Sequence, residues 1–182
     1  MQVHAPVMIM LVILFAVAAV FLPRATQAQE DKQRVFDDSR SAKAAFIKTD
    51  ESMNSLFNNS YGYAIFPNVG KGAAIIGGAG GNGGVFEKGK KIGTAKMVQI
   101  SAGAQVGGQA YREVIFFENK DALDRFKDNK LEFSGQVSAV AAKAGASATA
   151  KYREGVAVFT QEIGGLMLEA SLGGQKFTYK PL

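Results

Sequence analysis

The sequence YGYAIFPNVGKGAAIIGGAGGNGGVFEKGKKIGTAKMVQISAGAQVGG, residues 61–108, decides the fold, because it holds 14 of the 21 glycines in the chain. Glycine inside a helix or an ordinary strand costs about 0.5–1 kcal/mol relative to alanine, so this density needs a geometric reason. Turns with positive φ and strands that approach another backbone closely both supply one. The apolar runs between the glycines, at residues 64–66 and 74–76, are too short for helices. The stretch therefore predicts a series of short, tightly turned β-strands.

Further strands are predicted on the C-terminal side, at residues 94–101, 103–111, 113–117, 156–162, 166–172 and 175–179. In residues 166–172, Leu and Ala alternate with Met, Glu and Ser, as in a sheet with one solvated face. Residues 134–150 are almost all small, and we expect this segment to pack closely against the glycine-rich strands.

Two helices are predicted, one before and one within the strand region. Apolar residues at spacings of seven and four favour one long helix over residues 31–58, with an apolar face made of Val35, Ala42, Phe46, Met53 and Phe57. Its charges are balanced, which favours packing on the sheet over insertion into a membrane.

The second helix is short and covers residues 120–127. Asn119 is expected to cap it, Leu123 and Phe126 to face the core, and Asp121 to pair with Arg125. The chain is therefore predicted to be an α+β protein: a mainly antiparallel, glycine-rich, curled or barrel-like sheet with a long N-terminal helix and a second short helix.

The first 28 residues have the pattern of a signal peptide, with an apolar run at residues 7–22 and small residues at Thr26 and Ala28. This pattern predicts cleavage before Gln29, and an uncleaved anchor is the alternative. The expected organisation is a cleaved signal peptide over 1–28, a helix packed on the domain over 29–60, and a glycine-rich β domain over 61–182. Export would make the protein periplasmic or secreted, and an exported protein could also associate with a membrane.

Residue types exclude most catalytic chemistry. The chain has no cysteine, and its only histidine, His4, lies in the predicted signal peptide. Ser-His-Asp and Cys-His sites and the usual zinc ligands are therefore excluded. An all-oxygen Ca²⁺ site stays open, although no D-x-D-x-D-G loop is present. We expect no enzyme, no cofactor and no metal site, and we interpret the carboxylates Glu113 and Glu118 as surface charge.

Two nucleotide-like motifs fall within the glycine-rich stretch. Gly78, Gly80 and Gly83 match G-x-G-x-x-G, but the sequence that follows is typical of a strand and a hairpin turn, whereas the dinucleotide motif requires a helix. Residues 84–90 match G-x-x-x-x-G-K, but Lys91 stands where a Ser or Thr must contact Mg²⁺. No nucleotide is expected as a ligand.

The basic charge of the chain belongs to its β-rich part. The whole chain carries a formal charge of +5, and residues 61–182 hold 15 basic and 10 acidic side chains. This excess favours an anionic surface but is too small to indicate nucleic-acid binding. Lys88, Lys90 and Lys91 form the densest cluster, at an expected hairpin tip. They are either a solvated turn that protects a sheet edge or, with Lys71, contacts for lipid headgroups.

Several of these segments together resemble the SYLF domain. They are the run YAIFPNVGK at residues 63–71, the glycine-rich turn, QVGGQ at 105–109, the strand 114–117 with Asn119, and the C-terminal run from Gly164 to Gly174. The resemblance covers residues 53–179 and contains no catalytic motif. It implies binding to phosphoinositides or other anionic lipids, and binding of actin for some eukaryotic members, which an exported protein would not meet.

We therefore expect a non-enzymatic, exported module that associates with anionic phospholipid or a membrane surface through Lys71, Lys88, Lys90 and Lys91. The alternative is a protein-interaction or structural module of the cell envelope, which would use a sheet edge or a patch of Tyr61, Tyr63 and Phe66. A third hypothesis is a pocket for a small hydrophobic ligand inside the sheet, which would need a cavity.

Overall fold

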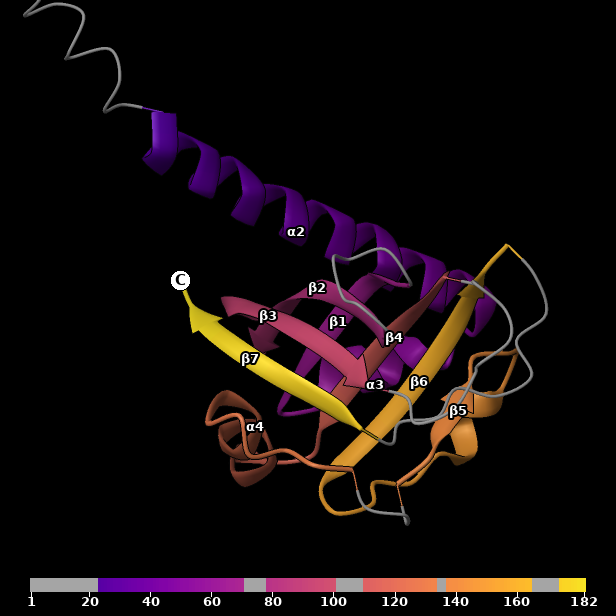
Figure 1. The fold of residues 1–182 in the computed structure, drawn as a ribbon. Coiled ribbons are helices and arrows are strands. Elements are labelled where there is room, and N and C mark those ends of the chain that lie inside the picture. The colour runs from indigo at the N-terminus through magenta and orange to yellow at the C-terminus, as the bar shows by residue number, and fades with distance from the viewer. Residues whose placement is uncertain (1–22, 71–77, 101–109, 134–136, 165–173) are drawn as a thin grey trace, which may run out of the picture. The chain divides into compact units, whose positions relative to one another are not determined.

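The structure of the chain is a computed structural model that describes residues 23–70, 78–100, 110–133, 137–164 and 174–182 (Figure 1). The chain divides into two compact units, residues 1–34 and 35–182. Helix α2 (Pro23–Thr49) begins in the first unit and ends in the second. All other elements described below lie in the second unit. No helix among the described residues has the length and hydropathy needed to cross a membrane.

The second unit is built on a seven-stranded sheet in the order β5-β6-β4-β1-β2-β3-β7. Its strands are β1 (Gly62–Val69), β2 (Gly78–Glu87), β3 (Lys90–Ile100), β4 (Ala110–Phe117), β5 (Ala139–Ala141), β6 (Val156–Ile163) and β7 (Gln175–Pro181). All neighbours are antiparallel except β5 and β6, which are parallel. The predicted α+β class is confirmed.

The predicted barrel-like closure is wrong, because the sheet is open. Its edges are β7 and the three-residue strand β5, which pair only with β3 and β6 respectively in the described part of the chain. The expectation of a mainly antiparallel sheet holds for five of its six strand pairs.

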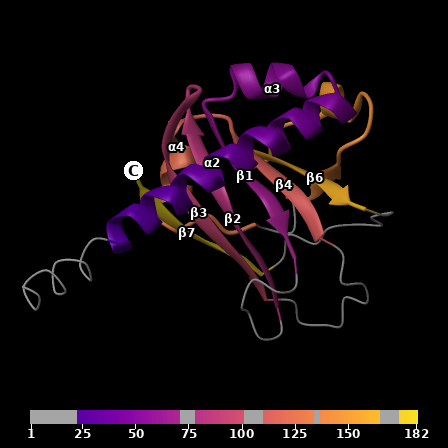
Figure 2. The ribbon, with the colours of Figure 1, turned by 90° about the horizontal axis from the view of Figure 1, so that it is seen from above.

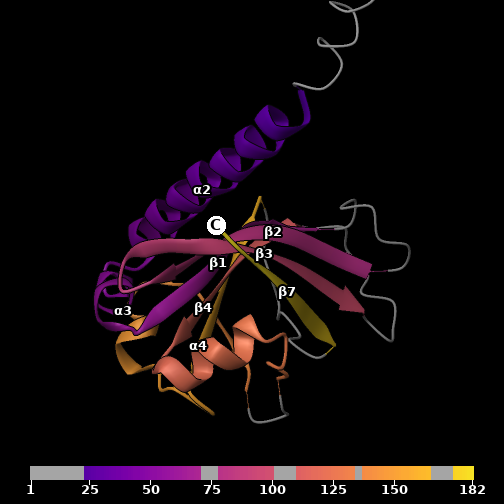
Figure 3. The ribbon, with the colours of Figure 1, turned by 90° about the vertical axis from the view of Figure 1, so that its left-hand side faces the viewer.

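The two faces of the sheet carry separate apolar clusters. Residues 35–49 of α2 and helix α3 (Met53–Asn59) cover the outer face, while helix α4 (Lys120–Lys127) covers the inner face (Figure 3). Seen from above, the part of α2 that belongs to the second unit lies over the sheet (Figure 2). The outer cluster contains Ala42, Phe46, Met53, Phe57, Tyr63, Ile65, Val114, Phe116, Ala157 and Phe159. The inner cluster includes Phe66, Val85, Met97, Ile115, Phe117, Leu123, Phe126 and Phe177.

The predicted single helix over residues 31–58 is wrong, because α2 and α3 are separate helices with a break at Asp50. The Asp50 carboxylate accepts hydrogen bonds from the backbone N–H of Ser52 (3.1 Å), Gly145 (3.2 Å) and Ser147 (2.8 Å). A side chain that bonds nearby and distant backbone groups in this way competes with helix continuation. The apolar face is nevertheless as predicted for Ala42, Phe46, Met53 and Phe57, which are buried, whereas Val35 is half-buried.

The hairpin between β2 and β3 confirms the prediction for the glycine-rich stretch. Lys88 and Gly89 have φ values of 48° and 76°, and Glu87 pairs with Lys90. Positive φ at both central residues is the type I′ turn of two-residue hairpins, which Gly89 adopts without strain. Gly78, Gly80 and Gly83 all lie in β2, so the dinucleotide-like motif has no helix after it.

Helix α4 also confirms its prediction, because it spans Lys120–Lys127 and the Asn119 side chain accepts a hydrogen bond from the backbone N–H of Ala122 at 3.0 Å. The expected ion pair of Asp121 with Arg125 is wrong. The Arg125 side chain donates instead to the backbone carbonyl of Glu154 at 2.6 Å. The ion pairs described on this helix join Asp124 to Lys120 and Lys127.

The small-residue segment forms one edge of the sheet. β5 pairs with β6, and the 3₁₀ turn η1 (Ala146–Thr149) lies next to α3, where Ser147 and Ser52 share a hydroxyl hydrogen bond of 2.6 Å. The strand of this segment therefore pairs with β6, while Val137 and Ala139 pack in the inner cluster that includes Val85 and Ala95 of the glycine-rich strands.

Several expectations lie outside the described residues: the apolar run at 7–22, Lys71, the strand at 166–172, and residues 74–76, 103–109 and 134–136.

Candidate functional site

The structure places Lys88, Lys90 and Lys91 at the β2–β3 hairpin, where all three are exposed. Lys88 Nζ lies 5.0 Å from the ring centre of Tyr61, and Lys91 Nζ lies 4.7 Å from that of Phe36. A cation over an aromatic ring is held by the ring's negative face, so these two lysines have preferred positions.

The two cation–ring contacts lie on opposite faces of the sheet. Tyr61 packs against the inner cluster and donates a hydrogen bond of 2.7 Å to Glu87. Phe36 belongs to α2 and makes an edge contact with Phe86, which packs against the outer cluster. The hairpin therefore does not bring its three lysines onto one surface. Their role as headgroup contacts stays a prediction.

A larger basic surface is formed by the pairing of β3 with β7. Lys96 pairs with Thr178, Lys176 with Val98, and Lys180 with Thr94, so the three lysines point to the same face of the two strands. Diagonal neighbours on one face of an antiparallel pair are about 7–8 Å apart. Thr94, which pairs with Lys180, pairs on its other side with Gly84 of β2, and Lys96 pairs with Asn82. Gly84 contacts α2, so this face of the sheet is the outer one.

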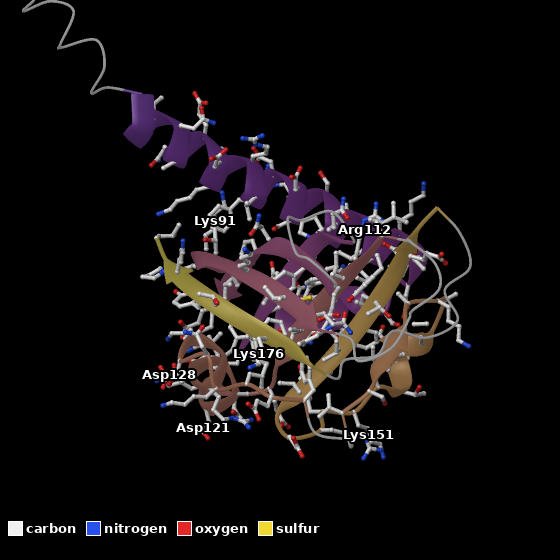
Figure 4. All side chains as sticks on the ribbon, in the orientation of Figure 1. Lys91, Arg112, Asp121, Asp128, Lys151 and Lys176 are labelled. Atoms are coloured by element: carbon white, nitrogen blue, oxygen red, sulfur yellow. The ribbon has the colours of Figure 1, made fainter. Side chains whose placement is uncertain are left out.

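Lys91 joins the same face at the hairpin end, because it pairs with Phe86. We call the set Lys91, Lys96, Lys176 and Lys180 the lysine face; all four side chains are exposed. Figure 4 shows Lys91 near the hairpin and Lys176 at the opposite end of β7.

No acidic residue belongs to β3 or β7, and Glu87 of β2 lies on the inner side with Tyr61. Within the described part of the chain, the five ion pairs lie on α2, on α4 or directly after α4, and none includes a lysine of this face. No described ion pair therefore offsets the positive charges of the lysine face, which favour an anion.

Sequence reasoning missed Lys96, Lys176 and Lys180, because β3 and β7 are far apart in the chain. The one signal was the alternation of polar and aromatic residues over residues 176–180, which predicts one solvated face but not the neighbouring strand.

A buried polar cluster lies on the inner face, and it corrects the interpretation of Glu113 as surface charge. Glu113 is fully buried, whereas Glu118 is exposed. Gln175 Nε2 donates to Glu113 Oε2 at 2.9 Å, and the Tyr111 hydroxyl donates to Gln99 Oε1 at 2.9 Å. Burial raises the pKa of Glu113 to about 8, against the lowering effect of the Gln175 hydrogen bond.

The cluster ties together strands that are not neighbours in the sheet. Glu113 and Tyr111 belong to β4, whereas Gln175 belongs to β7 and Gln99 to β3. β1, β2 and β3 separate β4 from β7 in the strand order, so contact between Glu113 and Gln175 requires a strongly bent sheet.

The fold and the basic face define an α+β domain with a curved open sheet and a lysine-lined outer surface. Residues 98–180 match the model of the Ysc84 family, described as "Las17-binding protein actin regulator", which is the SYLF family. The resemblance to SYLF domains is thereby confirmed for these residues. They include the last residues of β3 and the whole of β4, α4, β6 and most of β7.

The chain is also similar to Beta cell expansion factor A of Aeromonas veronii, with 32% identity over 152 residues. The matched region is 84% of this chain and 54% of the relative, so the chain spans about half the length of that protein.

Proposed function

We propose that this protein binds membranes that contain anionic phospholipid, and that the lysine face is its contact surface. The observation that carries the proposal is the gathering of Lys91, Lys96, Lys176 and Lys180 on one exposed face whose strands β3 and β7 hold no carboxylate. A lysine near an anionic membrane surface contributes about 1 kcal/mol. The match of residues 98–180 to the SYLF family supports a lipid-binding role.

Export is part of this proposal, since an exported protein would meet the phospholipid of the cell envelope. Its support is the apolar run at residues 7–22 followed by small residues. The matching family is described by Las17 and actin, but an exported chain would meet neither, so we propose no actin binding.

The experiment is co-sedimentation of the purified protein with vesicles of neutral lipid and of neutral plus anionic lipid, at low and physiological salt. We expect binding to the anionic vesicles alone, and weaker binding at the higher salt because exposed charges are screened. The variant K96E/K176E/K180E should lose about a hundredfold in affinity.

The matched control reverses three exposed lysines that lie outside the lysine face, in K48E/K143E/K151E. It changes the net charge by the same amount, so it separates a local contact from a general charge effect. Equal losses in the two variants, or binding that salt does not weaken, would contradict the proposal.

The alternative, a protein-interaction module of the cell envelope, has less support at its expected patch. Tyr63 and Phe66 are buried, and Tyr61 is half-buried. The edge of β7 is partly occupied, because the Tyr179 backbone N–H donates to Asn129 Oδ1 at 2.9 Å. Failure of the protein to bind any vesicle, together with capture of one defined envelope protein, would favour this alternative.

A further inference from the structure

Three side chains on the inner face carry buried oxygen atoms without a hydrogen-bond partner in the described part of the chain. These atoms are Glu113 Oε1, both carboxylate oxygens of Glu162, and Gln175 Oε1. Buried polar atoms are nearly always paired, because leaving one unpaired costs about 1–3 kcal/mol. Four such acceptors in one region of the sheet therefore need an explanation.

The strand register brings the two carboxylates together. Glu113 pairs with Thr160, and Glu162 pairs with Tyr111, so all four side chains point to the same face of β4 and β6. Glu113 and Glu162 are diagonal neighbours in this pattern, about 7–8 Å apart at the backbone. Two glutamate side chains at this separation can direct one oxygen each to a point between them.

Gln175 reaches the same place from β7. Its amide nitrogen contacts Glu113 Oε2 at 2.9 Å, which fixes the amide beside the carboxylate. Glu113 is fully buried and Gln175 is 4% exposed, so the unpaired Gln175 Oε1 lies in the interior next to Glu113.

No ion pair among the described residues includes the carboxyl group of Glu113 or of Glu162. Arg112, the basic residue beside Glu113 in the sequence, points to the opposite face, where it donates to Gln161 Oε1 at 3.2 Å. Gln161 in turn donates to the carbonyl of Ala45 in α2.

We propose that Glu113, Glu162 and Gln175 bind a calcium ion on the inner face of the sheet. Carboxylate and amide oxygens are the ligands that Ca²⁺ prefers, and water can complete its six to eight positions. The described residues hold no group of three or more His, Cys, Asp or Glu side chains, so an amide supplies the third protein ligand here. Mg²⁺ requires a stricter octahedral geometry and fits three ligands from three different strands less well.

A site with three protein ligands belongs to the weaker class of calcium sites, with a Kd of about 10⁻⁴–10⁻³ M. Such a value suits a compartment rich in calcium. Binding would also stabilise the fold, because the ion would join β7 to β4 and β6 without a shared strand edge.

The test is thermal unfolding of the full chain, first freed of metal with a chelator and then titrated with Ca²⁺ or Mg²⁺. We expect Ca²⁺ to raise the midpoint with half-saturation at or below about 1 mM, and Mg²⁺ to have a smaller effect. E113Q and E162Q should each weaken the response at least tenfold. The control E118Q, at an exposed glutamate directly after β4, should leave it unchanged.

A second measurement does not depend on thermal stability. Tb³⁺ replaces Ca²⁺ at oxygen sites and emits light when a nearby tyrosine is excited, and Tyr111 pairs directly with Glu162. We expect Tb³⁺ emission that Ca²⁺ displaces in the wild type and in E118Q, and none in E162Q. The proposal would be overturned if Ca²⁺ up to several mM changed neither readout, if Mg²⁺ acted as strongly, or if E113Q and E162Q responded like E118Q.

Discussion

The hydroxyl of Ser39 accepts a hydrogen bond of 3.0 Å from the backbone N–H of Gly84, which links helix α2 to strand β2. Ser39 also donates to the carbonyl of Val35 at 2.7 Å, so its hydroxyl is held by its own helix. A Cβ atom at Gly84 would lie 2.8 Å from the Ser39 oxygen and about as close to the rings of Phe86 and Phe36, at 3.0 and 3.1 Å. The outer face therefore accepts the helix at this point because residue 84 has no side chain.

Replacing Gly84 with alanine should destabilise the protein by about 1–3 kcal/mol, because the added methyl group overpacks this contact. Urea unfolding followed by far-ultraviolet circular dichroism measures the change. Gly70 supplies the control, since a Cβ there would meet neighbours at ordinary contact distances of 3.5 Å and above. Equal stability of G84A and G70A would show that α2 can shift without cost.

The buried Asp50 should make the protein sensitive to acid. Burial alone would raise the pKa of Asp50, but the hydrogen bonds from Ser52, Ser147 and Gly145 outweigh it and lower the pKa to about 2. A folded-state pKa below the unfolded value of 3.8 means that the charged form stabilises the fold. This stabilisation is complete above about pH 4 and is lost as the pH falls towards 2.

The size of the Asp50 effect follows from the pKa difference and is about 2 kcal/mol. We expect D50N to be less stable than the wild type by about this amount at pH 7, with the difference shrinking between pH 4 and pH 2. Unfolding by denaturant across this pH range measures it. D38N, at an exposed position of α2, should keep the wild-type profile; a constant difference between D50N and the wild type at all pH values would contradict the assignment.

The two lysine clusters should contribute unequally to vesicle binding. We expect K88E/K90E, which leaves Lys91 of the lysine face intact, to weaken binding to anionic vesicles less than K96E/K176E, because Lys88 lies over Tyr61 on the inner side. Both variants change the charge equally, so co-sedimentation compares position alone. A larger loss in the hairpin variant would move the membrane contact from the lysine face to the hairpin tip.

Processing of the N-terminus is the remaining prediction. Mass spectrometry of the protein recovered from its producing cells should show a chain that begins at Gln29. Cleavage there would fall within α2, which starts at Pro23, and would leave residues 35–49 in place on the sheet. A recovered chain that still carries residues 1–28 in the membrane fraction would support the uncleaved anchor.

Local features of this fold could be predicted from the sequence, because their causes are local. Asn119 caps α4 through a residue three positions away, and the turn at Lys88 and Gly89 needs only a glycine between two strands. The buried helix positions Ala42 and Phe46 follow from spacing alone. In each case the interacting atoms lie within a few residues in the sequence.

The features that sequence reasoning missed depend on distant partners. The break after α2 is set by Asp50, whose partners Gly145 and Ser147 lie 95 and 97 positions away. Glu113 was interpreted as surface charge because its amide partner, Gln175, comes from a strand 62 positions later. The lysine face needs β3 and β7 to pair, and no local pattern in either strand predicts this pairing.

The pairing of β3 with β7 also has a consequence for how the protein is made. β4, α4, β5, η1 and β6 all lie between these two strands in the chain, so the contact closes a very long loop and is among the slowest to form. During synthesis, Lys96 emerges long before Lys176 and Lys180. An unfinished chain therefore cannot present the complete set of charges, and only a fully synthesised and folded molecule can.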